Sequence, residues 1–174
     1  DNKGYDTQPA FSNDSSLAWL QMKTDGYEAD KNDIVVLRKG IKQNLTARWD
    51  GTVNSFMWAD NNKDIYFTAP IDGTIQIFSV DYPGLTRKLP VVSQLSEGQF
   101  NITGIVGQTK NSLIVTRTDM NHASEIYSFD LKTRTFKQLT HVNDDLYGKL
   151  TLPKVEKRYV TTKDIASVIH SCKL

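Results

Sequence analysis

The residues with the clearest potential for binding chemistry lie in one short stretch, residues 25–31, with the sequence Asp-Gly-Tyr-Glu-Ala-Asp-Lys. Tyr27, Glu28 and Asp30 place a phenol and two carboxylates close together in this stretch. Carboxylates can form charge-assisted hydrogen bonds, so these three residues are candidates for a binding role. The alternative is a solvated loop whose charges pair locally and contribute little.

Residues for covalent catalysis are not arranged in any recognisable pattern. The Gly-x-Ser-x-Gly turn that exposes a nucleophilic serine is absent from the sequence. The three histidines, His122, His141 and His170, show no triad arrangement with Ser and Asp. We therefore predict no catalytic residue, and we expect the chain to be inactive by itself.

One stretch imitates a metal-binding loop. Residues 60–64, Asp-Asn-Asn-Lys-Asp, begin like a calcium loop, but Ile65 stands where Gly is required and Ile71 where Glu is required. Asp and Asn are also typical of reverse turns, because their side chains bond to the local backbone. The sequence predicts a turn here, and neither a metal nor a cofactor.

The composition narrows the class of protein. The 174 residues are 39% hydrophobic and 24% charged, which is typical of a folded domain. A net charge of +1 argues against a dedicated nucleic-acid binder, and no apolar run reaches the roughly 20 residues of a membrane span. The single cysteine, Cys172, gives no information on the compartment. Because the chain begins with Asp1, we expect a removed leader or a position inside a larger protein.

The elements that must position these residues are β-strands. Short runs rich in β-branched and aromatic residues alternate with polar turns, and helical periodicity is absent over the first 160 residues. The runs also repeat, because Leu17, Ile65 and Leu113 fall 48 residues apart each time. A short strand with a Leu-Thr-like step closes each repeat: Asn44-Leu-Thr46, Lys88-Leu-Pro90 and Gln138-Leu-Thr140.

A period of about 40–50 residues with four strands per unit is typical of β-propeller blades. We therefore predict an all-β partial propeller over residues 1–145, with blades of roughly 48 residues at 9–52, 53–97 and 98–145. Propellers usually close with about 4–8 blades, so three blades would form an open arc. Its end blades would expose apolar faces, which predicts a missing remainder, a partner chain or self-association.

The last part of the chain departs from the repeat. Residues 146–164 are an expected exit segment, in which residues 155–160 alternate like a strand. Residues 165–174 form a divergent tail with neither a turn signal nor a further blade.

Several stretches resemble the propeller of the dipeptidyl peptidase 5 and acylaminoacyl-peptidase-like enzymes of the prolyl oligopeptidase family, Bacteroidetes type. The resemblance covers about residues 1–164 and is most specific at residues 25–31 and in the Lys-Val-Glu-Lys-Arg stretch at 154–158. It implies a parent serine peptidase whose propeller covers an α/β-hydrolase domain, and residues 154–164 resemble the linker into that domain. The tail does not match the relatives, which favours a premature end of the chain.

The resemblance implies a function for the binding loop. In a dipeptidyl peptidase, Tyr27, Glu28 and Asp30 would help to line the chamber that holds the free amine of a peptide substrate. The chain would then be the non-catalytic part that gates and selects peptide substrates for the missing hydrolase domain. A periplasmic or secreted location is implied in the same way.

Two alternatives remain open. One is a stand-alone propeller module, like TolB, that binds a protein partner; the linker-like segment at 154–164 counts against it. The other is a propeller hydrolase such as a glycosidase, which needs paired carboxylates converging on the propeller axis. The repeats show no acid at a shared inner-strand position, so this alternative ranks last.

Overall fold

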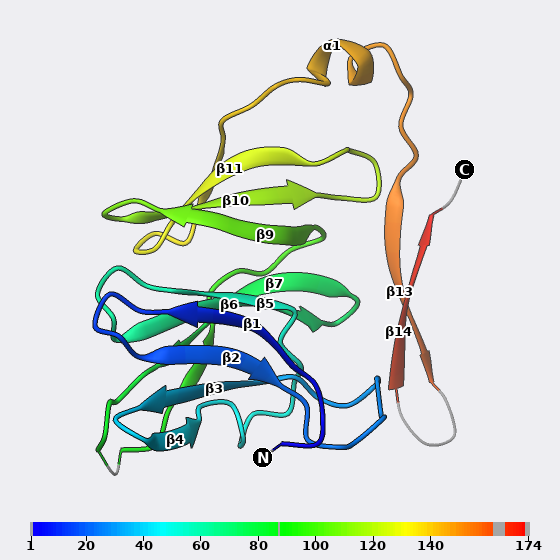
Figure 1. Ribbon diagram of the computed structural model, residues 1–174. Coiled ribbons are helices and arrows are strands. Elements are labelled where there is room, and N and C mark those ends of the chain that lie inside the picture. The colour runs from blue at the N-terminus through cyan, green and yellow to red at the C-terminus, as the bar shows by residue number, and fades with distance from the viewer. Residues whose placement is uncertain (1, 87, 162–165, 173–174) are drawn as a thin grey trace. The chain divides into compact units, whose positions relative to one another are not determined.

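The computed structural model describes residues 2–86, 88–161 and 166–172. The chain divides into two compact units, which are Asp1–Pro70 with Gln76–Glu97, and Ile71–Ile75 with Gly98–Leu174. In the described residues, three four-stranded sheets and one two-stranded sheet make up nearly all of the regular structure (Figure 1). The predicted all-β class, with three four-stranded blades, is confirmed.

The first sheet is an antiparallel meander whose strands follow the order of the chain: β1 (Asp6–Phe11), β2 (Leu17–Gln21), β3 (Asp33–Arg38) and β4 (Ile41–Asn44). Strand β2 alternates and buries Ala18 and Leu20. The β3–β4 connection is a two-residue turn in which Lys39 and Gly40 have φ values of 48° and 78°. Two positive φ values match the twist of a tight hairpin, and Gly40 adopts its value without steric cost.

The second sheet has the same order: β5 (Ser55–Trp58), β6 (Asp64–Ile71), β7 (Thr74–Asp81) and β8 (Val92–Gln94). The predicted turn-formers Asp72 and Gly73 join β6 to β7, again with two positive φ values, 48° and 75°. Strands β6 and β7 supply much of the core, with Ile65, Phe67 and Ile77 fully buried.

The first two sheets pack against each other inside the first unit. The Trp49 ring lies 5.4 Å from Phe67 and 5.3 Å from Phe78, centroid to centroid. The indole N–H of Trp58 donates to the Ala10 carbonyl across the two sheets at 3.2 Å. Aromatic rings therefore fill the space between consecutive sheets, which is how propeller blades are stabilised.

The third sheet lies in the second unit and has the order β9 (Asn101–Gln108), β10 (Ser112–Thr118), β11 (Glu125–Asp130) and β12 (Phe136–Gln138). Its core contains Ile102, Leu113, Val115 and Phe129, all fully buried. A single helical turn, α1 (Asp144–Tyr147), follows β12.

The exit segment continues as a hairpin. The predicted strand at 155–160 is β13 (Val155–Thr161), which pairs antiparallel with β14 (Ala166–Cys172). The division into a propeller of residues 1–145, an exit segment of 146–164 and a tail of 165–174 stays a prediction. Residues 162–165 and 173–174, which the exit segment and the tail include, lie outside the described residues.

The same hydrogen bonds recur in all three sheets and correct one part of the predicted repeat. Leu17, Ile65 and Leu113 each occupy the second strand of a sheet, as the 48-residue spacing predicted. The prediction that Lys88-Leu-Pro90 is the Leu-Thr-like step of the second repeat is wrong. The equivalent step is Leu95-Ser96, since in each sheet the leucine amide donates to an isoleucine carbonyl of the third strand: Leu45 to Ile34, Leu95 to Ile77 and Leu139 to Ile126, each at 2.8 Å.

The hydroxyl residue after each of these leucines links the third and fourth strands. Its hydroxyl donates a hydrogen bond to a polar side chain near the start of the third strand. The same hydroxyl accepts a hydrogen bond from the backbone N–H of the isoleucine that follows that side chain. The pairs are Asp33–Thr46, Gln76–Ser96 and Glu125–Thr140. The side chain that accepts the hydrogen bond from the hydroxyl is an acid in the first sheet, an amide in the second and an acid in the third. The repeat is thus conserved in its bonding although the residue types vary.

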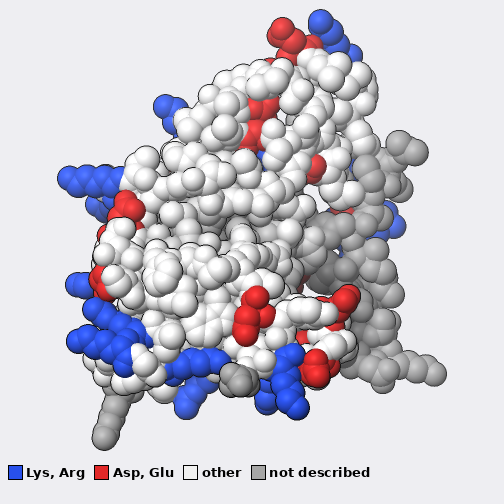
Figure 2. Space-filling model, viewed as in Figure 1, with Lys and Arg blue, Asp and Glu red and all other residues white. Residues whose placement is uncertain are grey.

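Charged side chains of both signs occur on the face that Figure 2 draws, and Lys and Arg gather there around the β3–β4 hairpin, which contains Arg38, Lys39 and Lys42. Arg38 forms an ion pair with Asp14 at 2.9 Å. Among the described residues, no helix has the length and apolar character that crossing a membrane requires.

Candidate functional site

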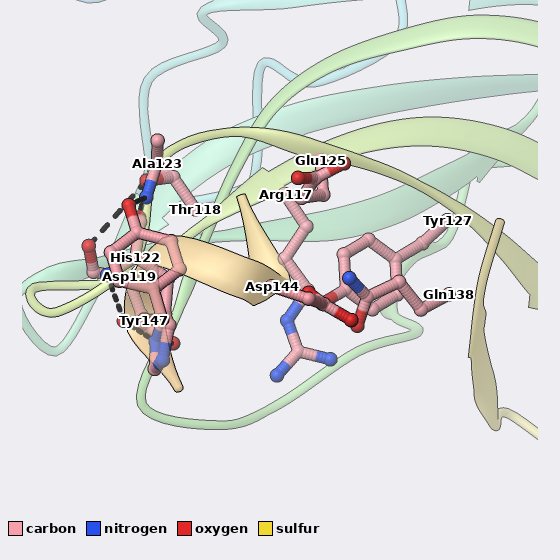
Figure 3. A pocket seen from close by; sticks show the side chains of 10 residues that line it. All are labelled: Arg117, Thr118, Asp119, His122, Ala123, Glu125, Tyr127, Gln138, Asp144 and Tyr147. Carbon is pink, nitrogen blue, oxygen red and sulfur yellow. Dashed lines mark hydrogen bonds and ion pairs between the residues drawn. The ribbon is translucent and has the colours of Figure 1, made fainter. Parts of the chain in front are cut away.

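A polar pocket lies where β10 ends and β11 begins, within the second unit. Its volume is about 430 Å³. The loop of residues 119–124 forms one wall, strands β10 to β12 form the floor, and α1 closes one side (Figure 3). The lining residues are Arg117, Thr118, Asp119, His122, Ala123, Glu125, Tyr127, Gln138, Asp144 and Tyr147.

Asp119 organises the loop at the wall of the pocket. Its Oδ1 accepts hydrogen bonds from the backbone N–H groups of Asn121, at 2.8 Å, and His122, at 2.9 Å. Both carboxylate oxygens also lie within 3.0 Å of His122 Nδ1. Since a carboxylate only accepts, the Nδ1 atom of His122 carries a proton. One carboxylate therefore binds both the backbone and the histidine side chain of this loop.

Tyr147 in α1 fixes the other side of the same loop. Its hydroxyl oxygen accepts a hydrogen bond from the Ala123 backbone N–H at 2.7 Å. Its ring meets the His122 ring edge to face, with centroids 4.9 Å apart. The short helix thus attaches the β10–β11 loop to the chain that follows β12.

Glu125 begins β11 and is only 7% exposed. Its carboxylate accepts hydrogen bonds from the Thr140 hydroxyl and from the backbone and side-chain N–H groups of Asn143, the latter at 3.2 and 3.3 Å. The Thr140 hydroxyl in particular holds the pKa of Glu125 below its ordinary value. Glu125 is therefore a charged group whose acceptors are already engaged.

Arg117 lies directly opposite Glu125 in the β10–β11 register, yet the two form no ion pair. Figure 3 shows the guanidinium and the Glu125 carboxylate pointing away from each other. The guanidinium carbon instead lies 4.0 Å from the ring centroid of Phe100, 4.8 Å from Tyr127 and 5.3 Å from Phe136. These three rings, called the aromatic cluster below, hold the cation by cation–π attraction.

The predicted binding residues lie in the first unit, in the β2–β3 loop. Tyr27 is 55% exposed, and Glu28 is also exposed. The Asp30 carboxylate accepts hydrogen bonds from the backbone N–H groups of Lys23, Thr24 and Lys31 at 2.7–3.0 Å. The hydrogen bond from Thr24 is the main cause of its lowered pKa. The structure places the three residues in one loop, and their role in binding stays a prediction.

The stretch that imitates a calcium loop forms the turn between β5 and β6. The Asn61 side-chain oxygen accepts the backbone N–H groups of Lys63, at 2.8 Å, and Asp64, at 3.1 Å, and its amide nitrogen donates to the Asp64 carboxylate at 2.7 Å. This is the local bonding that a reverse turn requires, as predicted.

Comparison with known proteins identifies the relatives of this chain. It is 28% identical over 164 residues to dipeptidyl-peptidase 5 of Porphyromonas gingivalis, a match that covers 92% of the chain and 23% of that enzyme. Dipeptidyl-peptidase 5 of Porphyromonas endodontalis is 30% identical over 162 residues, covering 91% of the chain and 23% of the enzyme. This chain is a homologue of the dipeptidyl-peptidase 5 enzymes. It spans about a quarter of the length of these curated relatives.

Solved structures show the same fold at lower sequence identity. The acylaminoacyl peptidase of Pyrococcus horikoshii superposes with a TM-score of 0.74 at 17% identity, covering 95% of this chain and 25% of that one. The β-propeller domain of the Trilobed protease from Pyrococcus furiosus gives 0.61 at 16% identity, covering 85% and 41%. TolB of Acinetobacter baumannii gives 0.58 at 20% identity, covering 80% and 33%. No protein-family model matches the chain. The chain therefore has the fold of part of a β-propeller.

Sequence reasoning missed the residues of the β10–β11 pocket. A lone arginine in a strand carries no signature. The aromatic cluster that contacts Arg117 combines Phe100, just before β9, with Tyr127 of β11 and Phe136 of β12. One signal was available: Glu125-Ile126 and Leu139-Thr140 repeat Asp33-Ile34 and Leu45-Thr46. Aligning these pairs places the β10–β11 loop at the same point of its repeat as the loop of Tyr27, Glu28 and Asp30.

Proposed function

We propose that this chain is a non-catalytic part of the β-propeller of a serine peptidase that releases dipeptides, where it admits and selects peptide substrates. The observation that carries the proposal is the sequence match to dipeptidyl-peptidase 5 across 92% of the chain. A catalytic α/β-hydrolase domain and a peptide substrate are the partners that the proposal requires.

The β2–β3 loop is the proposed contact for the amino end of the substrate. Among the described residues, the Glu28 carboxylate has no hydrogen-bond or ion-pair partner, and it is exposed. Asp30 is engaged by three backbone N–H groups, so Glu28 is the freer of the two acids. A free carboxylate on the residue that follows Tyr27 is suited to hold a protonated amine.

A titration of the full chain tests this proposal. The ¹⁵N-labelled chain is titrated with the tripeptide amide Ala-Phe-Ala-NH₂ and with its N-acetylated form, and amide shifts are followed by NMR. We expect shifts at residues 25–31 only with the free amine. Replacement Glu28→Gln should weaken the binding by about five- to tenfold, which is the value of one charge-assisted hydrogen bond near the surface.

Asp25→Asn is the matched control, because Asp25 is an exposed acid in the same loop that the proposal does not use. It should leave the affinity within about twofold, as expected for a surface charge. Equal binding of the acetylated peptide, or equal effects of the two substitutions, would contradict the proposed role of Glu28.

The TolB-like alternative is less well supported. TolB shares the fold at 20% identity, and likeness at that level supports the architecture alone. The match to dipeptidyl-peptidase 5 is a match in sequence along nearly the whole chain. We therefore favour the peptidase context over a stand-alone module that binds a protein.

A further inference from the structure

We infer that the pocket at the β10–β11 loop is a binding site for a carboxylate, which the Arg117 guanidinium holds by paired hydrogen bonds. Arg117 lines a pocket of about 430 Å³, large enough for the end of a peptide. The planar fork of a guanidinium matches the two oxygens of a carboxylate, and this pairing is among the strongest hydrogen-bonded contacts in proteins.

The guanidinium is held in place before any ligand arrives. Phe100, Tyr127 and Phe136 approach its carbon within 4.0, 4.8 and 5.3 Å of their ring centroids. Contact with aromatic rings removes water from the guanidinium and limits its motion, while the hydrogen-bond donors at its edge stay free for a ligand. No described residue accepts a hydrogen bond from this guanidinium or pairs with it as an acid.

The acids around the pocket already have partners. Asp119 is bonded to His122 and to two backbone N–H groups. Glu125 is bonded to Thr140 and Asn143. Asp144 pairs with His141 at 2.8 Å. Arg117 is thus the one charged side chain of the lining, as described, that has no polar partner.

The cross-strand position of Glu125 makes this arrangement unusual. An acid directly opposite an arginine in a sheet is placed where the two can form a stabilising pair. Here Thr140 and Asn143 bind the Glu125 carboxylate, and the arginine is left with only the aromatic cluster. The sheet therefore keeps a cation available at the pocket.

That the carboxylate belongs to a peptide rests on the proposed function. That Arg117 binds a carboxylate rests on the pocket itself. The carboxylate can come from the carboxyl end of a peptide or from an acidic side chain. These sources share one chemistry and are separated by the choice of probe.

The test is a titration of the ¹⁵N-labelled full chain with three N-acetylated tripeptides. Acetyl-Ala-Phe-Ala carries only a terminal carboxylate, acetyl-Ala-Phe-Ala-NH₂ carries none, and acetyl-Ala-Glu-Ala-NH₂ carries only a side-chain carboxylate. We expect the Arg117 Nε–H resonance to shift with a peptide that has a carboxylate, and the fully blocked peptide to bind at least about tenfold more weakly. Whichever carboxylate peptide binds more tightly identifies the source.

Two substitutions separate the charge from the packing. Arg117→Met keeps apolar contact with the aromatic cluster and removes every donor; Arg117→Lys keeps the charge and removes the fork. Both should weaken binding of the carboxylate peptide, by at least about tenfold for Met and by about threefold or more for Lys. Arg48→Gln, at an exposed arginine of the first unit, is the control and should change nothing.

Thermal unfolding of each variant shows whether the fold survives. Equal binding of the acid and the blocked peptide, or unchanged binding by a folded Arg117→Met variant, would overturn the inference. Because all probes have a blocked amine, the outcome is independent of Glu28. Failure of this inference and failure of the proposed function are therefore distinguishable.

Discussion

The β2–β3 loop and the β10–β11 loop occupy the same place in their sheets, between the second and third strands, but they differ in how they are held. In each, an aspartate accepts backbone N–H groups of the loop: Asp30 in the first and Asp119 in the second. The second loop is also attached to α1 through Tyr147. The first is attached to the segment that follows β4, because Lys31 donates to the Thr46 carbonyl at 2.8 Å and the Asn32 N–H donates to the Thr52 hydroxyl at 3.0 Å. The first loop leaves Tyr27 55% exposed, and the second borders a pocket.

The difference shows which charged groups a loop keeps for a ligand. The oxygens of an aspartate that accepts hydrogen bonds from the loop amides are already occupied. The groups that can bind a ligand are therefore other charged residues nearby. In the β2–β3 loop the acid Glu28 has no partner among the described residues, whereas beside the β10–β11 loop the cation Arg117 has no polar partner among them. Two equivalent loops thus offer opposite charges, suited to opposite ends of a peptide.

The largest expected effect on stability comes from a buried phenylalanine of β11, under the β10–β11 pocket. Phe129 is fully buried and lies 4.7 Å from the Phe136 ring of the aromatic cluster. Phe129→Ala should destabilise the protein by about 3–5 kcal/mol through a cavity and should weaken binding of acetyl-Ala-Phe-Ala. Urea denaturation and the peptide titration measure the two effects.

Phe67→Ala is the matched change in the first unit, where Phe67 is equally buried. It should cost about the same stability, 3–5 kcal/mol, but should leave the carboxylate affinity of the folded protein unchanged. If both substitutions weaken carboxylate binding equally, the pocket does not depend on the aromatic cluster.

A smaller effect is expected at the attachment to α1. Tyr147→Phe removes the acceptor of the Ala123 N–H and should cost about 1 kcal/mol, so that hydrogen exchange at this amide becomes about fivefold faster. Tyr27→Phe is the control in the other loop, since the described structure gives the Tyr27 hydroxyl no partner. An Ala123 exchange rate that Tyr147→Phe leaves unchanged would show that α1 does not hold the loop.

The smallest expected effects are on how the stability of the fold depends on pH. Glu125 and Asp30 both have a pKa below the ordinary values of 4.5 and 3.8. A lowered pKa stabilises the folded state above the ordinary value, and this contribution is lost as the pH falls through the folded pKa. Glu125→Gln and Asp30→Asn should each reduce stability at pH 7 and flatten its decline on acidification.

Chemical denaturation between pH 7 and pH 2 measures this, with Glu28→Gln as the control. Glu125→Gln should have the larger effect of the two, because Glu125 is nearly buried and Asp30 is in an exposed loop. A steeper decline below pH 4 in either variant would contradict the assigned direction of the pKa change.

The repeat could be predicted from the sequence because the second strands keep their apolar residues in register. Leu17, Ile65 and Leu113 are evenly spaced, and the buried alternation around them is local. The fourth strand of the second sheet could not be placed, because a long connection precedes β8 and Lys88-Leu-Pro90 within it imitates the closing step. There Gln76 and Ser96 replace the acid and threonine of the other sheets.

The candidate site divides in the same way. Tyr27, Glu28 and Asp30 are contiguous, so their grouping was visible in the sequence. The setting of Arg117 depends on Phe100, which immediately precedes β9, and on Phe136 of β12, and these two rings meet only in the folded sheet. That Glu125 would bond to Thr140 and not to Arg117 also depends on the return of β12 beside β11.

The most direct test of the whole account is a single titration of the ¹⁵N-labelled chain with unblocked Ala-Phe-Ala, which carries both a free amine and a free carboxylate. The account predicts shifts at residues 25–31 and at residues 117–127, around the β2–β3 and β10–β11 loops. Shifts confined to the opposite turns, at residues 12–16 and 60–64, would contradict it.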